Sequence, residues 1–151
     1  MAPRTSFLLI PLLLLAALGA TISPLQAAQP VHRVVFHVDE NDPARMNLTL
    51  NNAANVDAYY KDKAEEVEIE IVAYGPGLHM LRADTSPVKD RVQSFSQNFS
   101  NISFMACGNT MKGMGRKENQ EIALLSPAKV VPAGVVHLME RQQEGWAYIR
   151  P

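Results

Sequence analysis

The chain has 151 residues with a single cysteine, and its 14 lysines and arginines are nearly balanced by 15 aspartates and glutamates. This length is enough for one domain with a real core. The charge balance, without any lysine-arginine cluster, argues against a surface that binds nucleic acid, and a lone cysteine excludes a disulfide within the chain.

The amino-terminal segment has the pattern of a secretory signal peptide. Arg4 precedes an apolar run over residues 7–18, and small residues follow it. The run is shorter than the roughly 20 apolar residues that a membrane-spanning helix needs. We therefore expect a signal peptide over residues 1–28 and a mature chain that begins at Gln29, is exported to the periplasm and keeps no membrane span. A retained, uncleaved anchor is the alternative.

Residues 29–151 are expected to form one domain of alternating strands and helices. The first part is predicted to contain a strand over 32–38, a helix over 43–60, a strand over 67–74, a short helical turn over 78–81 and a helix over 88–99. The apolar run Val34–Phe36 is typical of a strand that is buried on both faces. Asp42 and Pro43 supply a helix cap and a first helical residue.

The second part repeats the alternation in shorter segments. It is predicted to contain a strand over 102–107, a brief helix over 109–119, a strand over 129–131, a helix over 133–143 and a strand over 146–149. The last helix is expected to face inward through Val135, Leu138 and Met139, with His137 on its surface. Five short apolar strands separated by helices indicate an α/β domain with a mostly parallel sheet and helices on both faces.

Cys107 lies where the apolar run of residues 102–106 meets the polar turn Gly108-Asn109. If a strand ends there and a helix begins, the thiol lies at the carboxyl edge of the sheet, where ligands bind in open α/β folds. The positive end of the helix dipole would favour a thiolate. The alternative is that Cys107 is a small apolar residue filling the core.

Two other loops should reach the same edge of the sheet, one after each of the first two strands. They would bring His37 from the first loop, and Gly75, Gly77 and His79 from the second. A thiol, imidazoles and glycines that permit close backbone approach are what a sulfur-handling pocket needs. Each histidine can instead be explained by local hydrogen bonds or by exposure to solvent, and His32 is expected to be peripheral.

Other kinds of site find little support. The phosphate-loop, dinucleotide, zinc-protease and serine-nucleophile patterns are all absent from the sequence. Met105, Met111 and Met114 could join Cys107 as soft ligands for Cu(I), but methionines in a core or an interface explain the pattern more simply. We therefore expect no cofactor and no resident metal.

Several segments resemble the DsrE/DsrF-like family, in particular its small stand-alone members with a signal peptide. The matching segments are His32–Asp39, Asp42-Pro43, Asn51–Asn55, Val72–Leu78, Phe104–Met111, Val130–Val135 and Glu144–Arg150. The resemblance implies a three-layer α/β/α domain with a five-stranded, mostly parallel sheet. It also implies homo- or hetero-oligomers, often built from trimers, and a sulfur-relay role in which a cysteine after the corresponding strand accepts sulfane sulfur. Cys107 is at that position.

Three functions follow as hypotheses. The first is an exported sulfur-transfer protein that carries a persulfide on Cys107, supported by Gly108, Asn109, His79 and His37, and exchanges sulfur with a thiol-bearing partner protein. Any enzymatic activity would then be at most that of a sulfur carrier or transferase. The second is a non-enzymatic oligomeric module that binds a small ligand, with a structural Cys107. The third is a Cu(I) protein.

Overall fold

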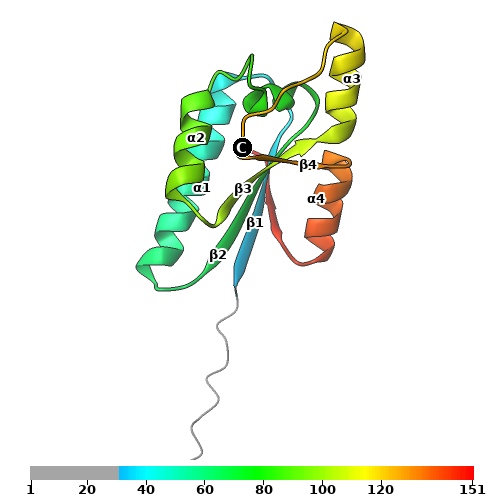
Figure 1. Ribbon diagram of the computed structural model, residues 1–151. Helices are drawn as coiled ribbons and strands as arrows, with labels where there is room; N and C mark the ends of the chain where they lie inside the picture. Colours follow the sequence, from blue (N-terminus) through cyan, green and yellow to red (C-terminus); the bar gives the residue numbers. More distant parts are fainter. Residues whose placement is uncertain (1–30) are drawn as a thin grey trace, which may run out of the picture.

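A computed structural model describes residues 31–151, which form a single parallel sheet flanked by helices (Figure 1). The predicted signal peptide lies outside the described residues. The strands are β1 (His32–Val38), β2 (Val67–Ala73), β3 (Ile102–Cys107), β4 (Ala128–Val131) and β5 (Ala147–Ile149). The helices are α1 (Pro43–Asp62), the 3₁₀ helix η1 (Gly75–Leu81), α2 (Lys89–Asn98), α3 (Gly108–Glu118) and α4 (Gly134–Gln143). The predicted α/β class is confirmed.

The strands lie in the order β4-β3-β2-β1-β5, and every neighbouring pair is parallel. Ala73 of β2 is level with Ala106 of β3, and Cys107 is level with Val131 of β4. The carboxyl ends of these strands therefore form one edge. The chain first runs outward from β1 to β4 and then returns to the other side of β1, so the strand order reverses between β1 and β5.

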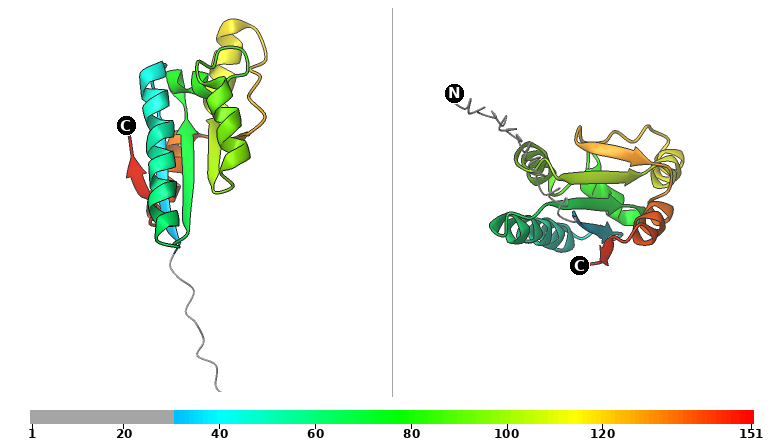
Figure 2. Two further views of the ribbon diagram at one scale, coloured as in Figure 1. Left: turned by 90° about the vertical axis from the view of Figure 1, so that its left-hand side faces the viewer. Right: turned by 90° about the horizontal axis from the view of Figure 1, so that it is seen from below.

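One face of the sheet carries the larger core. The helices α1 and α2 lie side by side over it (Figure 2). Met46, Leu50 and Ala53 of α1 recur at helical spacing and are fully buried against the sheet, as the sequence predicts. Asp42 caps α1 by accepting a hydrogen bond from the Ala44 amide at 2.8 Å.

The opposite face has a smaller core, in which α4 is the only helix that contributes a buried side chain. Its members are Val35, Val72, Met105, Val131, Leu138 and Trp146. The inward face predicted for α4 is correct for Leu138 and wrong for Val135 and Met139, which are each 54% exposed. The prediction failed because it assumed an apolar sheet surface beneath the helix, whereas β2 presents the carboxylate of Glu70 there.

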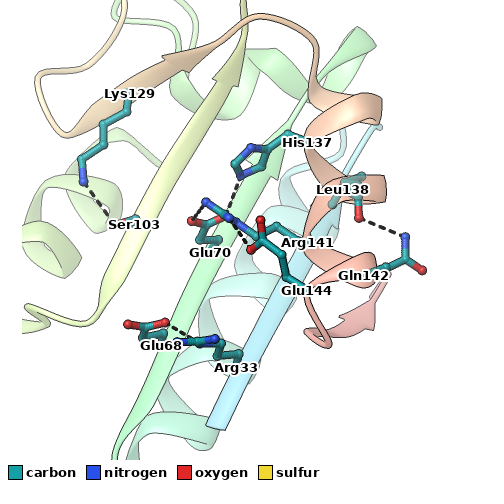
Figure 3. Close-up of polar contacts among 10 residues, drawn as sticks. All are labelled: Arg33, Glu68, Glu70, Ser103, Lys129, His137, Leu138, Arg141, Gln142 and Glu144. Carbon is teal, nitrogen blue, oxygen red and sulfur yellow. Dashed lines mark hydrogen bonds and ion pairs between the residues drawn. The ribbon is translucent and has the colours of Figure 1, made fainter. Parts of the chain in front are cut away.

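The side chains of α4 that meet Glu70 are polar (Figure 3). His137 was predicted to lie on the helix surface, but its Nε2 is 2.6 Å from a Glu70 carboxylate oxygen, and the Arg141 Nε donates to the same oxygen at 2.9 Å. Beyond α4, the amino half of this face is bare and forms a groove of about 900 Å³. Arg33 and Glu68 pair in the groove at 2.9 Å.

The helix α3 extends beyond the carboxyl edge of the sheet (Figures 1 and 2). Its far end is held by Arg82, a 1% exposed side chain that donates two hydrogen bonds to Glu118 and two to Asp84. Within residues 31–151, no helix has the length and apolar character needed to cross a membrane.

Candidate functional site

The side chains at the carboxyl ends of four neighbouring strands form a row on the face covered by α4. Side chains alternate between the two faces of a strand, so residues two positions after Val35, Val72 and Met105 lie on the same face as those core residues. These residues are His37, Tyr74 and Cys107. Tyr148 of β5, which is level with Val35, extends the row past β1. The row therefore runs Tyr148, His37, Tyr74, Cys107 across β5, β1, β2 and β3.

Cys107 is the last residue of β3 and the N-cap of α3, and it is 4% exposed. Its Sγ accepts a hydrogen bond from the Thr110 amide at 3.4 Å. Burial acts to raise the pKa of the thiol. Hydrogen bonds from the Thr110 hydroxyl and from the amides of Gly134, Thr110 and Asn109 outweigh it, so the pKa is lowered.

Two helices begin at this thiol. The helix α3 starts at the residue after Cys107, and α4 starts at Gly134, where a Cβ would come within 3.2 Å of the Cys107 Cβ. The N-cap of α4, Ala133, offers no side-chain cap, so the first amides of that helix have no side-chain acceptor there. Both helix dipoles place partial positive charge at Sγ, which favours the thiolate. This convergence is stronger than the single helix terminus expected from the sequence.

His37 is 7% exposed and stacks on Tyr74 with 4.7 Å between ring centroids. Its Nδ1 is 2.6 Å from the Tyr148 hydroxyl. Its Nε2 is buried and makes no hydrogen bond within residues 31–151; the nearest carboxylate, on Asp39, is 3.7 Å away. Burial lowers the pKa of His37, opposed by Asp39 and assisted by Arg150. The structure thus brings His37 into the row, next to Tyr74.

The glycines predicted at the site allow its backbone segments to turn and to pack closely. Gly75 has a φ of +52°, which favours glycine, and its amide donates to the Thr110 hydroxyl at 3.0 Å. A Cβ on Gly77 would lie 2.2 Å from the Val38 carbonyl oxygen, so only glycine fits. Gly108 packs on the end of β4 in the same way. The Asn109 amide donates to the Pro132 carbonyl at 3.1 Å, which ties the start of α3 to the loop before α4.

His79 does not join the row. Its Nδ1 is 2.7 Å from the Thr85 hydroxyl, in the segment that follows η1. The sequence places His79 close behind a glycine turn, but the turn continues as a 3₁₀ helix that carries the histidine into this other contact.

The methionines proposed as soft ligands are divided between two clusters. Met105 belongs to the smaller core with Val72, whereas Met111 and Met114 pack against the larger core. The sulfur of Met114 is 3.7 Å from the Arg82 guanidinium, an unsuitable neighbour for a bound cation. Among the residues that the structure describes, no three His, Cys, Asp or Glu side chains are grouped as metal ligands.

Sequence reasoning about loops missed Tyr74, Tyr148, Thr110 and Gly134. A signal existed for the first two: Tyr74 follows buried Val72 by two residues, and Tyr148 lies in the last predicted strand. If the alternation of side chains between the two faces of a strand is extended to the strand end, Tyr74 is expected on the same face of the sheet as Cys107. No local pattern marks Gly134, because its contact with Cys107 joins segments 27 positions apart in the sequence.

Comparisons with known proteins agree with this architecture. A family model described as the DsrE/DsrF-like family matches residues 32–151. A solved structure of a protein of unknown function, MTH1491 from Methanobacterium thermoautotrophicum, is 41% identical with a TM-score of 0.67, and the match covers 80% of this chain and 99% of that one. No curated protein matches.

Proposed function

Because the chain belongs to the DsrE/DsrF-like family, which supports a sulfur-relay type of fold, we propose that it carries sulfane sulfur as a persulfide on Cys107. The observation that carries the proposal is the convergence of two helix N-termini on one thiol of lowered pKa at the carboxyl edge of the sheet. A thiolate is the form of cysteine that attacks sulfur.

The proposed reaction is an exchange at sulfur that needs no oxidant. The Cys107 thiolate attacks the outer sulfur of a donor R–S–SH and forms a new S–S bond. The donor's S–S bond breaks and its electron pair leaves on R–S⁻. The new persulfide then gives its proton to that thiolate, so the products are Cys107–S–S⁻ and R–SH.

The setting proposed for this reaction is an exported homo-oligomer, built from trimers, that exchanges sulfur with a thiol-bearing protein. The amino-terminal pattern of the sequence supports export. Exposed apolar side chains close to the site, Val130 at 58% and Val135 at 54%, support a contact with another protein chain.

An intact mass spectrum of the mature protein before and after exposure to polysulfide, beside that of Cys107→Ser, tests the proposal. We expect one or more added sulfur atoms in the wild type, removed by a reductant and absent from the variant. A wild-type mass that stays unchanged, with a thiol that alkylates only after unfolding, would reject the persulfide. The same spectrum reports where the signal peptide is cleaved.

A second function is favoured by the low exposure of Cys107, 4%. A buried thiol is also typical of a cysteine that only packs in the core. If Cys107 has that role, the chain would be a module that binds a small ligand. In that case Cys107→Ala keeps ligand binding, whereas a sulfur carrier loses its activity.

A further inference from the structure

The row of side chains that ends at Cys107 begins at the point where the strand order reverses. Tyr148 on β5 and His37 on β1 meet there, with the hydroxyl 2.6 Å from Nδ1. Ligands of open α/β sheets bind outside the strand ends at such a reversal. The row therefore links the place where this fold binds ligands to the thiol two strands away.

Tyr74 stands between His37 and Cys107 in this row and is fixed from two sides. On one side its ring lies nearly parallel to His37, at an angle of 19°. On the other it packs on Gly134, where a Cβ would come within 3.1 Å of the ring and 3.2 Å of the Cys107 Cβ. Tyr74 and Cys107 thus both pack against Gly134, the first residue of α4.

The hydroxyl of Tyr74 has no hydrogen-bond partner within residues 31–151. The charged and polar groups that it senses include Asp39 and Tyr148, but Asp39 is bound by Arg150 at 3.1 Å and Tyr148 is bound to His37. Burial raises the pKa of Tyr74, and Asp39, Tyr148 and Cys107 raise it further. The hydroxyl therefore keeps its proton at neutral pH and remains available as a donor.

We infer that Tyr74 donates a hydrogen bond from its hydroxyl to the outer sulfur of a Cys107 persulfide, and that His37 and Tyr148 position its ring. The inference rests on the proposed sulfur-carrying function. The outer sulfur extends about 2 Å beyond Sγ, away from the amides of Thr110 and Gly134 that hold Sγ itself. It needs a separate donor, and Tyr74, whose ring packs on the same Gly134 as Cys107, has a hydroxyl that no group within residues 31–151 binds.

In this arrangement the thiolate and the persulfide are stabilised by different groups. The amides lower the pKa of Cys107 before sulfur arrives, and the Tyr74 hydroxyl is not among the groups that lower it. Tyr74 then favours the charged R–S–S⁻ product of the exchange over its return to a donor thiol. Loss of the hydroxyl should therefore shorten the life of the persulfide without changing the reactivity of the reduced thiol.

The variant Tyr74→Phe tests this directly, because it removes the hydroxyl and keeps the ring between His37 and Gly134. The chain offers a matched control in Tyr60→Phe, since Tyr60 stacks on His32 at 4.0 Å at the opposite end of β1. Each protein is loaded with polysulfide, the persulfide is followed by intact mass as it decays in a thiol of fixed concentration, and the reduced Cys107 is alkylated separately with iodoacetamide.

We expect Tyr74→Phe to lose its persulfide roughly tenfold faster than the wild type, the worth of one hydrogen bond to a charged group. Its alkylation rate should match that of the wild type, and Tyr60→Phe should match the wild type in both measurements. Tyr148→Phe, which frees His37, should show a smaller acceleration of the same decay.

Equal persulfide lifetimes in Tyr74→Phe and the wild type would overturn the inference and leave the sulfur-carrying function standing. A change in lifetime and alkylation together would also overturn it, because it would mean that the ring only shapes the pocket. If the wild type takes up no sulfur at all, it is the proposed function that fails.

Discussion

The two polar regions on the α4 face of the sheet differ in how their charges are satisfied. In the groove over the amino half, the charged side chains pair with one another: the buried Glu70 is bound by His137 and Arg141, and the exposed Arg33 is bound by Glu68. At the carboxyl edge, Cys107 is held by neutral amides, and a buried nitrogen of His37 has no hydrogen-bond partner within residues 31–151.

We infer from this difference that the groove contributes to stability, whereas the carboxyl edge is suited to chemistry. Paired charges in the groove hold α4 on the sheet and leave little interaction free energy for a ligand. The carboxyl edge, in contrast, has a nucleophile with a lowered pKa and donors directed at it. The groove, a hollow of about 900 Å³, is therefore not the place where we expect the reaction.

The largest effect should come from filling the close contact behind the carboxyl edge. Gly77→Ala places a Cβ 2.2 Å from the Val38 carbonyl oxygen, which is backbone and cannot move aside cheaply. We expect a loss of about 3 kcal/mol in the free energy of unfolding, measured by urea denaturation. Gly113→Ala is the control: no atom lies within 4 Å, and removing a glycine from α3 should add about 0.5–1 kcal/mol. Similar losses for both variants would refute the steric explanation.

A smaller effect should follow from breaking the charge network of the groove. Glu70→Gln leaves the half-buried Arg141 without its main partner and should lower the free energy of unfolding by about 2 kcal/mol. Alkylation of Cys107 and its sulfur uptake should not change. Glu68→Gln breaks an exposed pair, with side chains 44% and 51% exposed, and should cost less than about 1 kcal/mol. Loss of sulfur uptake in a folded Glu70→Gln protein would show that the two regions are coupled.

The smallest expected effect is on the pH dependence of Cys107 alkylation, which reports on the carboxyl edge alone. The rate follows the thiolate, so it should rise with pH and reach half its maximum at a lower pH than an ordinary thiol does, because the pKa of Cys107 is lowered. Thr110→Val removes the hydroxyl that helps to lower this pKa, so its midpoint should move to higher pH. Glu68→Gln should leave the midpoint in place. A wild-type midpoint above that of a free thiol would mean that burial dominates.

The sequence was sufficient for the strands and most of the helices, because each has a clear apolar period and a recognisable end. Asp42-Pro43 begins α1 and Gly75 ends β2 where expected. The shorter helices were harder: α2 begins at Lys89, one residue after the predicted start at residue 88, and the buried face of α4 was predicted from apolar residues alone. Glu70 is buried and His137 is half-buried through their pairing with each other, which a hydrophobic pattern does not register.

For the candidate site, the sequence located the thiol at the strand end and only part of the side chains around it. A thiol after an apolar strand and before a glycine turn identifies Cys107 locally. His37 was found for the same reason, as a strand-end residue. Gly134 and Tyr148 reach the row through contacts between distant segments, and His79 shows the converse, because its proximity in sequence did not bring it to the thiol.

We propose that sulfur chemistry takes place at the carboxyl edge and independently of the groove. The most direct test is to expose the wild type, Cys107→Ser and Glu70→Gln to polysulfide side by side and record the intact mass of each under native conditions. We expect reductant-sensitive sulfur on the wild type and on Glu70→Gln, and none on Cys107→Ser. Equal sulfur uptake by Cys107→Ser, or none by the wild type, would contradict it.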